Sequence, residues 1–153
     1  MNRYLLFLAA ILLAACQDQY DICDKQRAVN LDAGFYHVNA GVETTAYADS
    51  FNFSLLDAGT GIYNQVAHVS TISFPLNPAV DSAKYFIRFS NSLPADTIIV
   101  KYTSQNINIS QACGNVDIHT LTGVWSTKNT IDSLKLIDPN VNTDIIENLK
   151  IYF

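Results

Sequence analysis

Short apolar runs with a period of two, separated by turn-forming residues, constrain the fold of this chain more than any other feature. In Lys84–Ser90 and Asp96–Thr103, alternate positions are apolar and several intervening ones are polar or charged. Because successive side chains of a strand point to opposite faces, such segments form strands with one buried and one solvent-exposed face. Similar runs recur every 8–15 residues, with Gly, Pro, Asn or Asp between them, which is the pattern of a sandwich or barrel of short strands.

Helical periodicity is weak by comparison. No window keeps an apolar stripe at helical spacing over three turns, and the best helical segment, Asn142–Leu149, is short. Pro75 and Pro78 mark a loop or an edge strand, since proline cannot donate to a central ladder. The remaining strand-like segments are Ala33–Val38, Phe51–Leu55, Ile62–Val66, Val69–Phe74, Val116–Leu121, Ile131–Ile137 and Glu147–Phe153. We predict an all-β chain with one antiparallel β-sandwich domain, immunoglobulin-like or similar, over residues 31–153.

The N-terminal segment has the parts of an export signal that ends at a cysteine. Arg3 supplies a positive charge, Leu5–Leu13 is an uninterrupted apolar run, and Leu13-Ala14-Ala15-Cys16 matches the lipobox of bacterial lipoproteins. We therefore expect residues 1–15 to be a cleaved lipoprotein signal peptide, Cys16 to be lipidated, and residues 16–30 to form the lipidated N-terminus and a tether. The alternative is an ordinary secretory signal with a chance cysteine.

Charge and location follow from this interpretation. Loss of Arg3 leaves eight basic residues against fourteen acidic ones, a formal net charge of −6. Without a basic cluster, nucleic-acid binding is not expected, and the protein would be attached to the membrane through its lipid alone. Gln17 is not the aspartate that commonly retains lipoproteins at the inner membrane. This favours a lipid-anchored protein of the outer membrane and leaves its periplasmic face and the cell surface both open.

Two cysteines, Cys23 and Cys113, remain after lipidation of Cys16. The cell envelope oxidises paired thiols, and two thiols allow only one pairing. A Cys23–Cys113 bridge would stabilise the fold by roughly 4–5 kcal/mol in the chain-entropy model. Two separate buried thiols are the alternative. Zinc is not expected, because the chain has no Cys-x-x-Cys and no paired His-x₃₋₅-His.

Four segments together resemble a known group of proteins. These are Asp21–Cys23, Pro75–Pro78, Asp96–Tyr102 and Ser110–Gly114, whose order and spacing extend across nearly the whole chain after Cys16. In them the chain resembles a family of small cell-envelope lipoproteins of Gram-negative bacteria that is known only as a domain of unknown function. The resemblance implies an envelope lipoprotein with two shared cysteines, and it brings no activity with it.

Catalytic and ligand-binding motifs are absent from the sequence. There is no Gly-x-Ser-x-Gly, Ser-x-x-Lys, His-Glu-x-x-His, P-loop or dinucleotide fingerprint. His37, His68 and His119 each stand alone in a strand-like stretch, so surface or core imidazoles are favoured over a metal site. Glu43 and Glu147 are the only glutamates, which argues against a paired-glutamate glycosidase. We assign no catalytic, cofactor-binding or metal-binding residue.

Aromatic residues are plentiful and suit a sandwich core. We expect a core that contains Phe35, Phe51, Phe53, Phe74, Phe86 and Phe89. A buried or half-buried position is also expected for Trp125, as is usual for this large side chain. An exposed Trp125 beside Tyr63 or Tyr102 would instead indicate a carbohydrate or protein contact face.

Three functions are compatible with these observations. The first is a non-catalytic binding or structural module that is lipid-anchored in the cell envelope, with an unidentified ligand or envelope protein partner. The second is a small envelope hydrolase with an unrecognised site. The third is an accessory lipoprotein subunit of an outer-membrane transport or assembly complex.

Overall fold

The computed structural model describes residues 23, 28–57, 59 and 61–153, and these residues form strands and loops without a helix. In chain order the strands are β1 (Asn30–Asn39), β2 (Val42–Thr45), β3 (Phe51–Leu55), β4 (Gly61–Val66), β5 (Thr71–Pro75), β6 (Ser82–Arg88), β7 (Asp96–Ser110), β8 (Gly114–Ser126), β9 (Ser133–Leu136), β10 (Asn140–Val141) and β11 (Leu149–Tyr152). The all-β prediction is confirmed. Within the described ranges, no helix is long and apolar enough to span a membrane.

The segment with the best helical pattern is a loop. Residues 142–148 lack regular structure, and Leu149 begins β11. The side-chain carbonyl of Asn142 accepts a 2.7 Å hydrogen bond from the backbone N–H of Asp144, so the loop starts with an Asx turn that competes with a helix.

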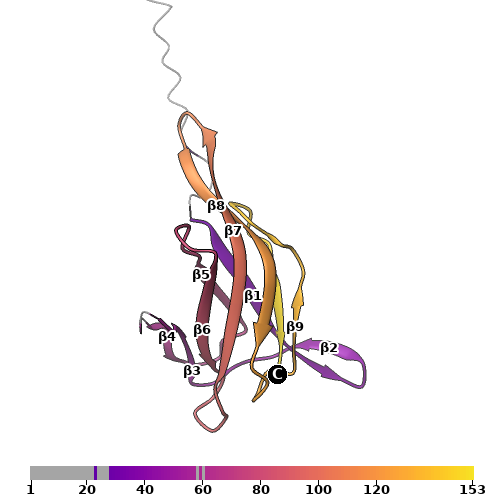
Figure 1. The fold of residues 1–153 in the computed structure, drawn as a ribbon. Coiled ribbons are helices and arrows are strands. Elements are labelled where there is room, and N and C mark those ends of the chain that lie inside the picture. The colour runs from indigo at the N-terminus through magenta and orange to yellow at the C-terminus, as the bar shows by residue number, and fades with distance from the viewer. Residues whose placement is uncertain (1–22, 24–27, 58, 60) are drawn as a thin grey trace, which may run out of the picture.

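Two sheets pack against each other, as the sandwich prediction requires (Figure 1). One sheet has the order β2-β1-β11-β9, with β5 also paired to β1, and the other has the order β10-β8-β7-β6-β3-β4. The pairings are antiparallel apart from that of β1 with β11, which is parallel and sets Phe35 opposite Ile151. The beginning and the end of the domain therefore lie side by side in one sheet.

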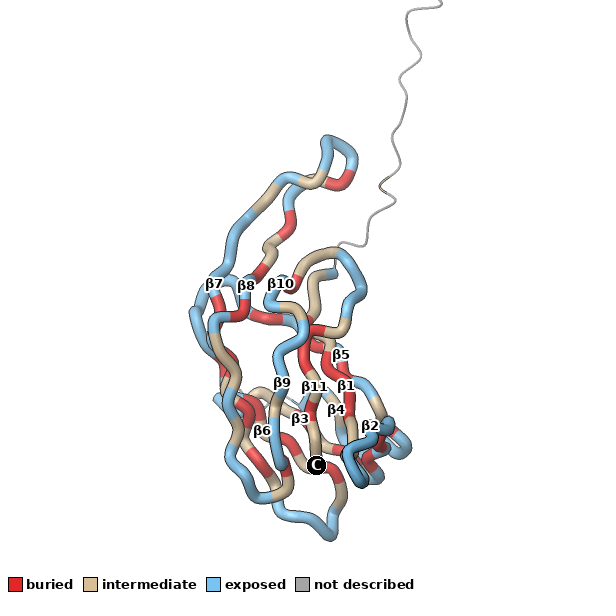
Figure 2. Tube along the Cα trace, turned by 90° about the vertical axis from the view of Figure 1, so that its right-hand side faces the viewer, coloured by how far each residue is buried: buried red, intermediate tan, exposed pale blue. Residues whose placement is uncertain are grey.

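The core lies between the sheets and follows the period-two pattern. Figure 2 shows buried positions alternating with less buried ones along the strands. In β6 and β7, Tyr85, Ile87, Ile98 and Val100 are buried, as expected. The ring of Phe35 lies 5.2 Å, between centroids, from both Phe51 and Phe89, so aromatic contacts join strands that are distant in the chain.

One of the six phenylalanines expected in the core is not there. The buried ones are Phe35, Phe51, Phe53, Phe74 and Phe89. Phe86 is only partly buried and lies on the outer face of its sheet, because its neighbours Tyr85 and Ile87 take the inward positions of β6. In a strand whose residues are nearly all apolar, hydrophobicity alone does not decide which face is inside.

The β7–β8 hairpin extends beyond the rest of its sheet (Figure 1). A ladder of side-chain amides crosses its outer part: Asn108 donates to Asn115 at 2.7 Å, and Asn115 donates to Asn106 at 2.9 Å. The chain turns back at Cys113 and Gly114, where Gly114 has a φ of 74° that favours glycine.

A buried carboxylate organises the chain between β8 and β9. Asp96, 2% exposed, accepts hydrogen bonds from the Thr127 hydroxyl at 2.6 Å and from the backbone N–H groups of Asn129, Thr130 and Ile131 at 2.7–2.8 Å. Burial alone would raise the pKa of Asp96, but the four hydrogen bonds outweigh burial and hold it below its usual value. Asp96 is therefore an ionised structural anchor.

Candidate functional site

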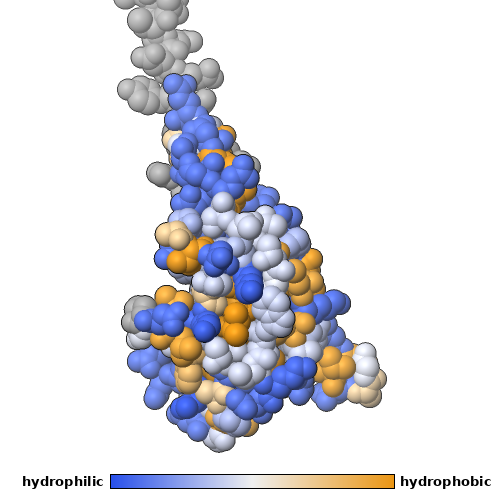
Figure 3. Space-filling view, viewed as in Figure 1, coloured by the Kyte–Doolittle hydropathy of each residue, from blue (hydrophilic) through white to orange (hydrophobic). Residues whose placement is uncertain are grey.

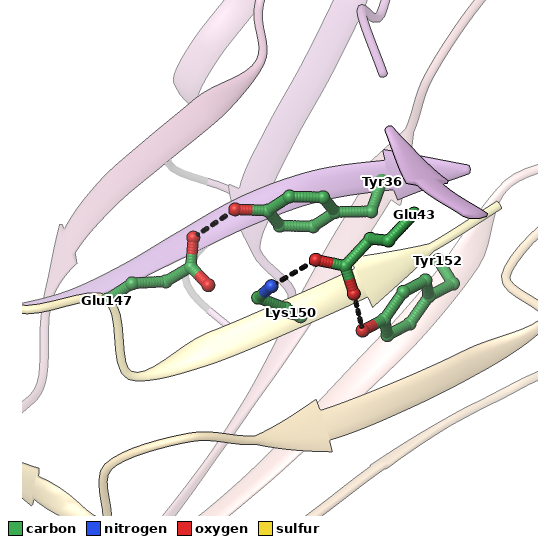
Figure 4. Close-up of polar contacts among 5 residues, drawn as sticks. All are labelled: Tyr36, Glu43, Glu147, Lys150 and Tyr152. Carbon is green, nitrogen blue, oxygen red and sulfur yellow. Dashed lines mark hydrogen bonds and ion pairs between the residues drawn. The ribbon is translucent and has the colours of Figure 1, made fainter. Parts of the chain in front are cut away.

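Five polar side chains gather on the outer face of the sheet that contains β1 and β11 (Figure 4). We call this group the Glu43–Glu147 cluster, and its members are Tyr36, Glu43, Glu147, Lys150 and Tyr152. The only two glutamates of the chain are thus neighbours in space, although no motif in the sequence connects them.

Each carboxylate of the cluster is held by a tyrosine hydroxyl. Tyr36 donates to Oε2 of Glu147 at 2.6 Å, and Tyr152 donates to Oε2 of Glu43 at 2.6 Å. Lys150 forms an ion pair with Oε1 of Glu43 and lies 4.3 Å from the centre of the Tyr36 ring. The ammonium group of Lys150 therefore connects the two halves of the cluster.

The parallel pairing of β1 and β11 brings these residues together. Tyr36 lies opposite Tyr152 in the register, with ring centroids 5.9 Å apart. Gly34 lies opposite Lys150, and a Cβ at Gly34 would be 2.4 Å from Oε2 of Glu147 and 2.8 Å from the Tyr36 ring. The absence of a side chain at Gly34 therefore makes room for the contact between Tyr36 and Glu147.

Hydrogen bonding moves the pKa values of Tyr36, Glu43, Lys150 and Tyr152 away from neutrality. The bond to Glu147, followed by burial, raises the pKa of Tyr36 to about 12. The bonds from Lys150 and Tyr152 lower the pKa of Glu43, and the bond to Glu43 raises the pKa values of Lys150 and Tyr152. At pH 7 the cluster therefore holds an ionised Glu43, a charged Lys150 and two protonated phenols.

These protonation states suit binding better than proton transfer. A general acid or base works best with a pKa near the working pH, and the shifts of Tyr36, Glu43 and Lys150 lead away from it. A cavity of about 420 Å³ adjoins the cluster, and its lining includes Glu43, Lys135 and Tyr152. Fixed charges and phenol groups beside this cavity offer hydrogen bonds and an aromatic surface to a polar ligand.

Two of the three predicted site cysteines lie in the part of the chain that the structure describes. Cys16 is outside it. Cys23 and Cys113 are joined by a disulfide with 4.8 Å between their Cα atoms, within the range that such a bond needs. The bridge holds the chain ahead of β1 against the tip of the β7–β8 hairpin, and the alternative of two separate buried thiols is wrong for this structure.

The three histidines lie at separate places. His37 contacts the backbone carbonyl of Phe153, His68 stacks on Tyr47 at 4.1 Å between ring centroids, and His119 is buried and 2.9 Å from the Ser104 hydroxyl. Burial lowers the pKa of His119. Among the described residues, no group of three His, Cys, Asp or Glu side chains could hold a metal ion.

The expected buried or half-buried position of Trp125 is wrong. It is 51% exposed on the outer face of the sheet that contains β7 and β8. Gly123 permits this position, because its Cβ would be only 2.3 Å from the Trp125 ring. Neither tyrosine considered as a neighbour joins it to form a contact face: Tyr102 is buried, and Tyr63 belongs to the edge strand β4.

The Glu43–Glu147 cluster was missed from the sequence because its members come from three segments of the chain. The alternation of Phe35 with Tyr36 and of Ile151 with Tyr152 indicates which side chains share the outer face. It does not indicate that β1 and β11 are partners, since a period-two pattern specifies a face and not a neighbour.

Comparisons with known proteins identify a family and no activity. No curated protein matches the chain, and no solved structure matches it. A family model described as a family of unknown function, DUF6452, matches residues 44–153, which include most of the strands and three of the five residues in the Glu43–Glu147 cluster. The chain belongs to this family of unknown function, DUF6452.

Proposed function

We propose that this protein is a lipid-anchored component of the cell envelope whose sandwich domain is a non-catalytic binding module. The observation that carries the proposal is the combination of the Leu13-Ala14-Ala15-Cys16 string with a disulfide seven residues later. A lipid on Cys16 would anchor the chain, and the bridge from Cys23 to Cys113 would fix how the domain stands on its anchor.

A lipid on Cys16 would give the domain a defined orientation at the membrane. The bridge attaches the N-terminal segment to the tip of the β7–β8 hairpin, and Figure 1 places β2 at the other end of the molecule. The hairpin would then be the membrane-proximal end, and Glu43 on β2 would be turned away from the membrane. Figure 3 shows a mostly hydrophilic surface at the hairpin end, which suits attachment through the lipid without burial in the hydrocarbon.

The outer membrane is the favoured location. Gln17 follows Cys16 where inner-membrane retention commonly uses aspartate. A binding role is supported by the Glu43–Glu147 cluster, whose groups are fixed in place and poorly suited to acid–base chemistry.

Metabolic labelling with a palmitate analogue, followed by membrane fractionation, tests the anchor. Wild-type protein and a Cys23→Ser/Cys113→Ser double variant should both carry the label and sediment with the outer membrane. Cys16→Ala should carry none and leave the membrane fraction or remain unprocessed. Equal labelling of Cys16→Ala and wild type would contradict the proposal.

The non-catalytic role has its own test. Purified protein should show no turnover of chromogenic ester, glycoside and peptide substrates. Turnover that Glu43→Gln or Glu147→Gln abolishes, in a variant with an unchanged melting temperature, would establish the hydrolase alternative instead.

A further inference from the structure

A second polar site lies on the other sheet, away from the Glu43–Glu147 cluster. A groove of about 590 Å³ crosses β4, β3 and β6, and Arg88 of β6 and Asn52 of β3 lie opposite each other in the register within it. Its lining also includes Tyr63, Gln65, Phe86 and Asn91. This volume is within the range of small-molecule sites.

Arg88 is the only arginine among the described residues, and it forms no ion pair with any of them. No aspartate or glutamate among the described residues lines the groove, and the salt bridge found in that part of the chain involves Lys150 instead. The Nε atom of Arg88 is buried and has no hydrogen-bond partner among the described residues. A buried N–H without an acceptor is costly, and an atom enclosed in this way is not reached from the groove. An oxyanion would bind the two terminal nitrogens of the guanidinium group, which are accessible and also have no hydrogen-bond partner among the described residues.

The surroundings hold the Arg88 side chain at the groove. Its guanidinium carbon lies 5.4 Å from the centre of the Phe86 ring, which is on the same outer face of β6. The outward position of Phe86, unexpected from the sequence, thus has a consequence: the ring supports the guanidinium group from one side.

The wall opposite Arg88 has an irregular backbone. The β3–β4 pairing shifts register between Phe51 and Phe53 and again between Phe53 and Ser54. Gln65 has a φ of 49°, and its N–H donates to the side-chain carbonyl of Asn52 at 3.1 Å. Bulges and left-handed residues re-aim side chains beside binding sites, and here they place the amide-bearing segment of β4 along the groove.

We infer that this groove binds an acidic saccharide, with the sugar carboxylate on Arg88. The planar guanidinium fork matches a carboxylate. The amides of Gln65 and Asn91 match sugar hydroxyls in hydrogen-bonding capacity, and both side chains are exposed. The inference does not depend on the lipid anchor, because it uses only residues of the sandwich domain.

Digalacturonate is a suitable probe, and its methyl ester is a matched neutral control of nearly the same shape. Titration of isotope-labelled protein, purified in mild detergent, should shift the amide resonances around Asn52, Gln65 and Arg88. We expect the methyl ester to bind at least about tenfold more weakly, as loss of a charged bidentate hydrogen bond predicts.

Substitutions in strand β6 test whether the charge of Arg88 binds the ligand. Arg88→Gln should weaken digalacturonate binding about tenfold or more, and Arg88→Lys, which keeps the charge without the fork, should lie in between. Lys84→Gln removes the same charge from the same face of β6 outside the groove, and it should bind as the wild type does. A melting temperature for each variant verifies folding.

Several results would overturn the inference. One is the absence of shifts around the groove at about 10 mM digalacturonate, well above a millimolar dissociation constant. Others are equal binding by Arg88→Gln and wild type, or equal binding of the methyl ester. An acidic dipeptide or inorganic phosphate that binds more tightly than digalacturonate would show that the groove recognises an anion and not an acidic sugar.

Discussion

The hydroxyl of Tyr36 donates a 2.6 Å hydrogen bond to Oε2 of Glu147, although 111 residues separate the two in the chain. This contact exists because β1 and β11 pair in parallel, so that the first and last strands share one outer face. It is the part of the Glu43–Glu147 cluster that most changes the chemistry of a side chain, since it raises the pKa of Tyr36 to about 12.

Glu147→Gln should therefore lower the pKa of Tyr36 toward the ordinary tyrosine value of about 10. The amide removes both the charged acceptor and the negative charge that oppose ionisation of the phenol. Tyrosine ionisation followed by NMR measures this directly. Glu43→Gln is the control and should affect mainly Tyr152; an unchanged Tyr36 pKa in Glu147→Gln would contradict the contact.

Gly34→Ala should destabilise the protein by about 1–3 kcal/mol, the usual cost of forcing a methyl group into occupied space. The added Cβ would meet Glu147 and the Tyr36 ring within 2.8 Å. Gly61→Ala is a matched control in β4, where the structure has nothing within 4 Å of the new Cβ. Chemical denaturation measures both variants, and equal stabilities would show that Gly34 does not make room for the cluster.

Asp96→Asn should cost about 3 kcal/mol at pH 7, because an uncharged amide cannot accept all the hydrogen bonds that Asp96 receives. The pKa of Asp96 is lowered in the folded protein. Its contribution to stability is therefore complete above the unfolded pKa of about 3.9 and is lost as the pH falls through the lower folded value.

Denaturation curves measured over a range of pH test the direction of this pH dependence of stability. Below about pH 4 the wild type should lose stability more steeply than Asp96→Asn, which has no such proton to take up. Parallel curves for the two proteins would contradict an ionised Asp96 anchor.

Cys113→Ser should lower the free energy of unfolding by roughly 2–5 kcal/mol. The bridge closes a loop with a sequence separation of 90 residues and holds the chain ahead of β1. Denaturation of the variant and of the reduced wild type should agree, and membrane attachment should not change. An equal stability of oxidised and reduced wild type would contradict a stabilising bridge.

The sequence predicted which faces of the strands are buried where the two faces differ in polarity. In Asp96–Thr103 the inward residues Ile98, Val100 and Tyr102 are buried as expected. The prediction was wrong for Phe86, because the segment from Tyr85 to Ile87 is apolar on both faces and only packing against the other sheet decides between them.

The sequence did not predict which distant strands pair with each other. Nothing local to Phe35 or Ile151 indicates that these residues are partners, and the parallel register between them places Tyr36, Lys150 and Tyr152 on one face. The Cys23–Cys113 pairing was accessible only because two thiols leave no alternative partner. The exposure of Trp125 depends on Gly123 beside it, a relationship that composition and periodicity do not contain.

The most direct measurement of the central proposal is the mass of the protein purified from the membrane fraction without reduction. We predict a chain that begins at Cys16, carries acyl groups on that residue, and has Cys23 and Cys113 protected from alkylation until a reductant is added. A chain that keeps residues 1–15, or one without acyl groups whose two thiols alkylate at once, would contradict a lipid-anchored domain oriented by the bridge.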